Sequence, residues 1–181
     1  PLDRGKILTD ADTEGLAKFE RYGDPDGDGI PFRTLPGIKD RRGVFFTRGS
    51  GHNTKAAYTE KGPDYVQAMD RLKKKFETAR NHVPKPLKSG SGTNEIGIIA
   101  FGSSHDAVRE SIHFLKADAG LDVDYLRIRA FPFHEDILNF IKSHNRIFVV
   151  DQNRDAQMLS LLKLEPALAS EISKMESILH Y

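Results

Sequence analysis

The chain has 181 residues, of which 38% are hydrophobic and 29% charged, so it can bury the core of an ordinary globular domain. Its net charge of +1 gives no global field that favours nucleic acid or an anionic membrane. No apolar run reaches the roughly 20 residues of a transmembrane helix. The absence of cysteine excludes disulfides, thiolate metal sites and a cysteine nucleophile. We therefore expect a cytoplasmic protein with neither a nucleic-acid nor a membrane partner.

Residues 1–92 are expected to be a connecting segment with irregular loops and one long helix. Thr9 is a suitable N-cap for a short helix that ends near Arg21. From 24 to 62 the chain is rich in Gly, Pro, Asp and Arg and has no periodicity, and such a stretch is too long for an idle loop. We expect it to cover another surface. Apolar residues at helical spacing then predict an amphipathic helix over 64–82.

Residues 93–181 alternate strand-like and helix-like patterns, which predicts an α/β domain with a mostly parallel sheet and helices on both faces. Ser104 is the expected N-cap of the first of these helices, and Gly120 its C-terminal stop. Tyr181 lies in an expected strand and Pro1 is not a methionine, so we expect both ends to be cut and this domain to be truncated at its end. The expected strands are 95–101, 123–128, 146–150 and 176–181, and the expected helices are 104–119, 135–143, 156–163 and 166–174.

An acidic loop opens like a calcium-binding loop, with the pattern D-x-D-x-D-G. Three carboxylates at alternate positions can converge on one hard cation, with Ca²⁺ preferred over Mg²⁺, and the carbonyl of Ile30 can add a ligand. Leu35, however, stands where an EF-hand places its bidentate glutamate. An acidic, glycine-rich turn without an ion is therefore the alternative. The candidate metal ligands are Asp24, Asp26 and Asp28.

Two polar, glycine-containing loops, 31–37 and 46–53, carry residues suited to anions. An arginine beside backbone N–H donors can hold a carboxylate or phosphate, and long loops are frequent binding surfaces. The same side chains could instead fasten a partner chain. The candidates for substrate or interface contacts are Arg33, Arg48, Ser50 and His52.

Polar residues also follow the first and third strands of the expected sheet. Ser103 and Ser104 offer hydroxyls at a helix N-terminus, an arrangement that binds anions at the carboxyl edge of open α/β sheets. Helix capping is the alternative. Asn153 lies in a polar cluster at the same edge and is a further substrate or interface candidate. No dinucleotide fingerprint, serine elbow, paired carboxylates or histidine metal pair is present, so no catalytic residue is predicted.

Five segments, in this order, closely resemble the alpha subunit of 2-oxoacid:ferredoxin oxidoreductases, particularly the 2-oxoglutarate:ferredoxin oxidoreductase branch. No single motif decides the resemblance, but together the segments extend over nearly the whole chain. They are Gly27–Gly37, Phe46–His52, Arg71–Ala79, Leu126–Phe133 and Val149–Gln157.

The resemblance implies that the chain is a C-terminal fragment of that subunit. Such an enzyme decarboxylates a 2-oxoacid on thiamine diphosphate with Mg²⁺, passes electrons through iron–sulfur clusters to ferredoxin, and makes acyl-CoA. Residues 93–181 would be its transketolase C-terminal-like domain. The family's Y-P-I-T-P-type motif for thiamine and substrate is missing here, as is any cysteine for a cluster. The resemblance therefore implies an architectural role beside a beta subunit and further subunits, no activity in isolation, and no cofactor in this part except a possible Ca²⁺ or Mg²⁺.

Two other readings of the residues stay open. One is an α/β module that binds a phosphate or nucleotide at Gly102–His105. The other is an interaction domain stabilised by calcium at the acidic loop.

Overall fold

The structure, a computed structural model, describes residues 3–46 and 49–181. The chain forms two compact units, Pro1–Ala79 and Arg80–Tyr181. The division lies at the end of the long helix, whereas the sequence-based expectation placed it after the Gly/Ser-rich stretch that ends at residue 92. Among the described residues, no helix is both long and apolar enough to cross a membrane.

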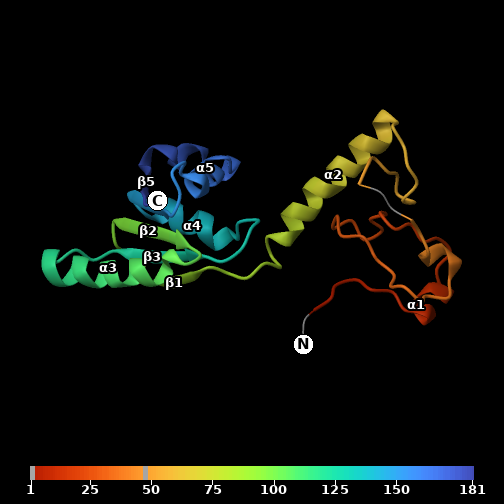
Figure 1. Cartoon of the computed structure of the whole chain (residues 1–181), viewed down its shortest axis with the longest axis horizontal. Coiled ribbons are helices and arrows are strands. Elements are labelled where there is room, and N and C mark those ends of the chain that lie inside the picture. Colours follow the sequence, from red (N-terminus) through yellow and green to blue (C-terminus); the bar gives the residue numbers. More distant parts are fainter. Residues whose placement is uncertain (1–2, 47–48) are drawn as a thin grey trace. The chain divides into compact units, whose positions relative to one another are not determined.

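The C-terminal unit contains one five-stranded sheet in the order β1-β3-β2-β4-β5 (Figure 1). The strands β2, β3, β4 and β5 are parallel to their neighbours, and only β1 runs antiparallel, against β3. The mostly parallel α/β fold predicted from the alternating patterns is therefore confirmed. The strands are β1 (Leu87–Ser89), β2 (Ile96–Phe101), β3 (Asp124–Ile128), β4 (Arg146–Asp151) and β5 (Met175–Leu179).

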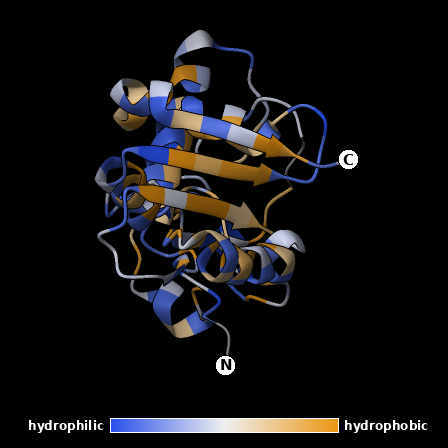
Figure 2. Ribbon diagram, turned by 90° about the vertical axis from the view of Figure 1, so that its left-hand side faces the viewer, coloured by the Kyte–Doolittle hydropathy of each residue, from blue (hydrophilic) through white to orange (hydrophobic). Residues whose placement is uncertain are grey.

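Helices pack on both faces of this sheet, because successive residues of a buried strand point to opposite sides. In β2, Ile99 faces the larger apolar cluster, whereas Ile98 and Ala100 face the smaller one. Helix α3 (Ser104–Ala119) covers the smaller cluster, and α4 (Glu135–Ser143), α5 (Gln157–Lys163) and the 3₁₀-helix η2 (Pro166–Lys174) cover the larger one. Figure 2 shows β2, β4 and β5 side by side with largely hydrophobic colouring. Each fully buried Leu or Ile in such a core contributes about 1.5–3 kcal/mol.

Some local expectations for this unit hold and others do not. Gly120 ends α3 in the left-handed conformation, as predicted. The predicted cap at Ser104 is wrong: Ser104 is the first helical residue, and Ser103 occupies the cap without a side-chain hydrogen bond. The final helix is a 3₁₀-helix. Strand β1 lies in the expected connecting segment, where no strand was predicted, because its three residues are exposed and show no alternating apolar pattern.

A buried carboxylate organises the start of β3. Asp124 accepts hydrogen bonds from the backbone of Gly92 at 2.9 Å and Asn94 at 3.1 Å, and it contacts Nε2 of His144 at 3.1 Å. Burial raises the pKa of Asp124, but these hydrogen bonds outweigh it and hold the pKa below its ordinary value. The carboxylate thus ties the loop before β2 to the end of α4.

A second polar anchor holds the chain where this unit begins. Both oxygens of the Glu165 carboxylate accept hydrogen bonds from Arg80, at 3.0 and 2.8 Å. Arg80 also donates to the carbonyl of Phe133 at 3.1 Å. Because the pair is partly buried and Arg80 also holds a backbone carbonyl, it positions the chain ahead of β1 more firmly than an exposed ion pair could.

The N-terminal unit has little regular structure, as predicted. Helix α1 (Asp10–Glu14) is capped by Thr9, which forms a capping box with Asp12, but it ends well before the predicted Arg21. The 3₁₀-helix η1 spans Arg41–Gly43. Helix α2 (Gly62–Ala79) corresponds to the helix expected over 64–82, and none of its residues is fully buried.

Candidate functional site

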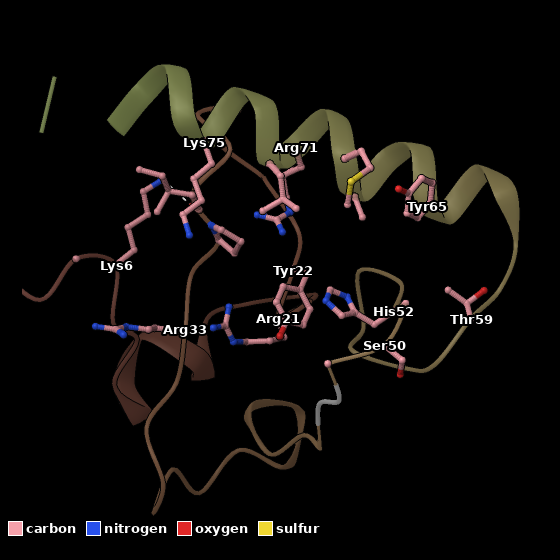
Figure 3. A pocket seen from close by; sticks show the side chains of 18 of the residues that line it. Lys6, Arg21, Tyr22, Arg33, Ser50, His52, Thr59, Tyr65, Arg71 and Lys75 are labelled. Carbon is pink, nitrogen blue, oxygen red and sulfur yellow. Dashed lines mark hydrogen bonds between the residues drawn. The ribbon is translucent and has the colours of Figure 1, made fainter. Parts of the chain in front are cut away.

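A cavity of about 870 Å³ lies within the N-terminal unit, between one side of α2 and the irregular loops (Figure 3). Among the described residues its charged lining is unbalanced, because six cationic side chains face one carboxylate, that of Glu60. The cations are Arg4, Lys6, Arg21, Arg33, Arg71 and Lys75.

Tyr22 organises the centre of this cavity. Its ring stacks on the imidazole of His52 with the centroids 3.9 Å apart. The guanidinium carbons of Arg21 and Arg71 lie 4.8 and 5.7 Å from the centroid of the same ring. Arg21 also lies over Phe45, at 5.4 Å. Planar contacts of this kind hold guanidinium groups in place without neutralising them.

Arg71 is a partly desolvated cation of the cavity lining. It donates a hydrogen bond to the carbonyl of Gly29 at 3.1 Å. Desolvation lowers the pKa of the Arg71 guanidinium, the nearby charge of Arg21 lowers it further, and Asp24 opposes both without restoring it. A guanidinium keeps its proton at neutral pH, so Arg71 is a charged and partly desolvated group in the cavity lining.

Of the six lining cations, only Lys6 forms an ion pair with a carboxylate within the described residues. Among residues 3–46 and 49–181, no Asp or Glu forms an ion pair with the other five, which are Arg4, Arg21, Arg33, Arg71 and Lys75. The buried Nε of Arg21 also has no hydrogen-bond partner within that part of the chain. The guanidinium of Arg33 donates to the carbonyl of Arg4, at 2.5 Å. The cavity is therefore built to attract negative charge.

The structure brings three sequence-predicted residues to this cavity: Arg33, Ser50 and His52. Arg48, the fourth candidate from the same loops, lies outside the described residues. Sequence reasoning missed Arg21, Tyr22 and Arg71. Only Arg71 could have been found from the sequence. It lies three residues after Ala68, and this helical spacing places it on the side of α2 that includes Leu72 and Lys75.

The acidic loop is occupied by an ammonium group. Nζ of Lys6 lies 2.6 Å from a carboxylate oxygen of both Asp26 and Asp28, and 3.2 Å from the carbonyl oxygen of Ile30. Candidate ligand oxygens of Asp24, Asp26 and Asp28 lie within 4.8 Å of one another. The loop therefore has the convergence that its sequence pattern predicts, with Lys6 supplying positive charge at that point.

The candidates at the carboxyl edge of the sheet are engaged in local contacts. Ser103 donates to the side-chain carbonyl of Gln152 at 2.9 Å, which links the ends of β2 and β4. Ser104 is buried at the start of α3. Asn153 donates to Asp151 at 3.0 Å and accepts from two backbone amides of the turn before α5. These bonds account for the loop geometry without a ligand.

Neither a protein-family profile nor a curated protein sequence matches the chain. Among solved structures, it is similar to 2-oxoglutarate:ferredoxin oxidoreductase from Magnetococcus marinus, described with 2-oxoglutarate, coenzyme A and succinyl-CoA bound. The TM-score is 0.74 at 20% sequence identity, over 92% of this chain. The chain has the fold of part of this oxidoreductase. It spans 28% of the length of the oxidoreductase chain.

The oxidoreductase fold confirms the resemblance that five sequence segments had indicated, at the level of structure. The match includes 92% of the chain. The structural similarity therefore extends beyond the α/β domain to most of the N-terminal unit, which contains the irregular loops that form the cavity. At this identity the likeness establishes fold, and chemistry has to be argued from the residues.

Proposed function

We propose that this chain is part of the alpha subunit of a thiamine diphosphate-dependent 2-oxoacid:ferredoxin oxidoreductase that acts on 2-oxoglutarate. The observation that carries the proposal is the agreement of two independent comparisons. The order of five sequence segments points to this family, and the fold over 92% of the chain resembles a member of it at a TM-score of 0.74.

Within such an enzyme the proposed role is mainly architectural. The chain has no cysteine, so it cannot supply thiolates to an iron–sulfur cluster, and it lacks the family's thiamine motif. Thiamine diphosphate, Mg²⁺ and the clusters would be held by other parts of a cytoplasmic complex that includes a beta subunit and passes electrons to ferredoxin. The α/β unit offers a packed, helix-covered body suited to subunit contacts.

The residues proposed for substrate or interface contacts are those that the cavity gathers. Arg33, Ser50 and His52 lie together in its lining, which supports a shared role. Arg48 is proposed from the sequence alone. Asn153, Ser103 and Ser104 are weaker candidates, because their polar groups are engaged locally or buried.

The test is co-expression of the complete subunit with its partner subunits, followed by native mass spectrometry and an assay of viologen reduction that depends on 2-oxoglutarate and coenzyme A. Removing the segment equivalent to 80–181 should both prevent assembly of the complex and abolish turnover. Arg33→Ala should raise the 2-oxoglutarate KM or weaken assembly, whereas Lys73→Gln on the exposed side of α2 should do neither. A stable complex without 2-oxoacid activity would overturn the assignment.

A further inference from the structure

The arginines of the C-terminal unit divide into two groups. One group forms ion pairs with carboxylates at distances between 2.7 and 2.9 Å, and its members are Arg80, Arg146 and Arg154. The other group forms no ion pair with an Asp or Glu of the described residues, and its members are Arg109, Arg127 and Arg129. Arg109 and Arg129 are exposed, and Arg127 is half-buried. The unpaired arginines therefore belong to α3, to β3 and to the residue that follows β3.

Two of the unpaired arginines lie near the buried phenol of Tyr125. Burial raises the pKa of Tyr125, and the positive charges of Arg127 and Arg109 oppose that rise. Asp106 contributes negative charge at the same point. Nδ1 of His105 lies 2.8 Å from the Tyr125 hydroxyl, which holds the start of α3 beside β3 (Figure 1). The two arginines are thus brought together by the packing of α3 on the sheet.

An exposed apolar side chain lies next to these cations. Leu87 of β1 is opposite Arg127 of β3 in the antiparallel pair, so both side chains are on the face of the sheet that α3 covers. Leu87 is 45% exposed. Arg129 directly follows the last residue of β3. We call Leu87, Arg109, Arg127 and Arg129 the arginine surface.

The composition of the arginine surface distinguishes between anionic partners. Arginine is enriched at protein–protein interfaces, where its planar fork matches carboxylate geometry. A nucleic acid would require more phosphate contacts than three arginines provide, and the net charge of +1 adds no long-range attraction. A small inorganic anion would leave Leu87 in water. An acidic segment of a polypeptide can contact both the guanidinium groups and the leucine.

We propose that the arginine surface docks an acidic segment of a partner polypeptide, with carboxylates on Arg109, Arg127 and Arg129 and an apolar side chain on Leu87. Arg127 donates to the carbonyl of Gly102 at 3.3 Å, and a guanidinium has further N–H donors beyond this bond. The inference requires only the geometry of the C-terminal unit. The proposed oxidoreductase activity does not enter it.

Fluorescence anisotropy with the 181-residue chain tests the proposal, and the probe is a labelled, glutamate-rich peptide that contains leucine. The peptide should bind saturably, and its affinity should fall as salt rises, because exposed ion pairs are screened. Oligothymidylate and inorganic phosphate should each bind at least about ten-fold more weakly, because neither engages the apolar part of the surface.

Charge reversals assign the binding to the arginine surface. Arg109→Glu combined with Arg129→Glu should weaken the peptide at least about ten-fold, because each change replaces an attraction by a repulsion. Arg146→Glu combined with Arg154→Glu is the matched control, since it changes the net charge equally at arginines that already have carboxylate partners. It should weaken the peptide less than about three-fold. Leu87→Ala should weaken the leucine-containing peptide but not a peptide with serine in place of leucine. Circular dichroism would establish that each variant is folded.

Four outcomes would overturn the proposal. The peptide does not saturate the chain; the two double reversals weaken it equally, which would indicate a general effect of charge; oligothymidylate or phosphate binds at least as tightly as the peptide; or folded Leu87→Ala binds both peptides as the unaltered chain does. None of these measurements requires turnover, so failure here and failure of the oxidoreductase assignment are distinguishable.

Discussion

Replacing Lys6 by methionine should destabilise the N-terminal unit and expose its acidic loop to divalent cations. Methionine keeps an unbranched apolar side chain of similar length but removes the ammonium that lies 2.6 Å from both Asp26 and Asp28. Burial lowers the pKa of Lys6, yet the two carboxylates outweigh it and raise that pKa above its ordinary value. The ammonium is therefore held in its charged form.

The structure sets the size of the effect. The Lys6 side chain is 22% exposed and its partners are 44% and 33% exposed, so each pair is worth up to about 1 kcal/mol. The loss should be about 1–2 kcal/mol, which corresponds to about 4–16 °C in the Tm of a unit of this size. Lys18→Met, which breaks one pair involving a highly exposed lysine, should cost less than about 0.5 kcal/mol.

Calcium should then restore the stability that the variant loses with the Lys6 ammonium. With a Kd of about 0.1–1 mM, as in extracellular calcium modules, 10 mM Ca²⁺ would stabilise the Lys6→Met variant by about 1.4–2.7 kcal/mol. The unaltered chain should show no shift, because Lys6 already occupies the same oxygens. Thermal unfolding by circular dichroism with calcium or with chelator measures both. An equal calcium response in the two proteins would refute the reasoning, as would an unchanged Tm for the variant.

Two predictions concern the C-terminal unit. Asp124→Asn should cost about 1–3 kcal/mol at pH 7, because it replaces a buried carboxylate that accepts hydrogen bonds from the backbone of Gly92 and Asn94. A carboxyl whose folded pKa is lowered adds stability that is present above its unfolded pKa of about 3.9 and is lost as the pH falls through the folded value. Urea unfolding should therefore show that the free energy of unfolding falls less between pH 7 and pH 3 in the variant than in the parent. An equal fall in both proteins would contradict this. Gly97→Ala should cost about 1–3 kcal/mol through overpacking, since its methyl would lie 2.8 Å from both Ile147 and Phe140; a urea midpoint equal to the parent's would exclude that clash.

The sheet was predictable because its physical signal is local and repeated. Buried parallel strands are apolar on both faces, and β2 and β4 stand out as apolar runs between polar turns. Glycine at 120 marks a left-handed helix end that few other residues tolerate. β1 could not be found in this way, because its three residues are exposed and its place in the sheet depends on pairing with β3.

The cavity was predictable only in part. Loop composition identified Arg33, Ser50 and His52 as anion candidates, and the structure brings them together. No sequence period relates these positions to Tyr22 or to Arg71 on α2, because the loops between them follow no repeating geometry. For the acidic loop, the sequence predicts the motif but not its partner. Its pattern predicts converging oxygens, but the positive charge from Lys6 comes from outside the motif.

The strand order has a consequence for folding during synthesis. β2 lies between β3 and β4, and both of these strands follow it in the chain. The apolar strand β2 is therefore made before both of its neighbours and remains without one of them until β4 has left the ribosome. Parallel pairing over such separations forms slowly. Nascent chains arrested before residue 146 should consequently aggregate or recruit chaperones, whereas chains that extend past 151 should not.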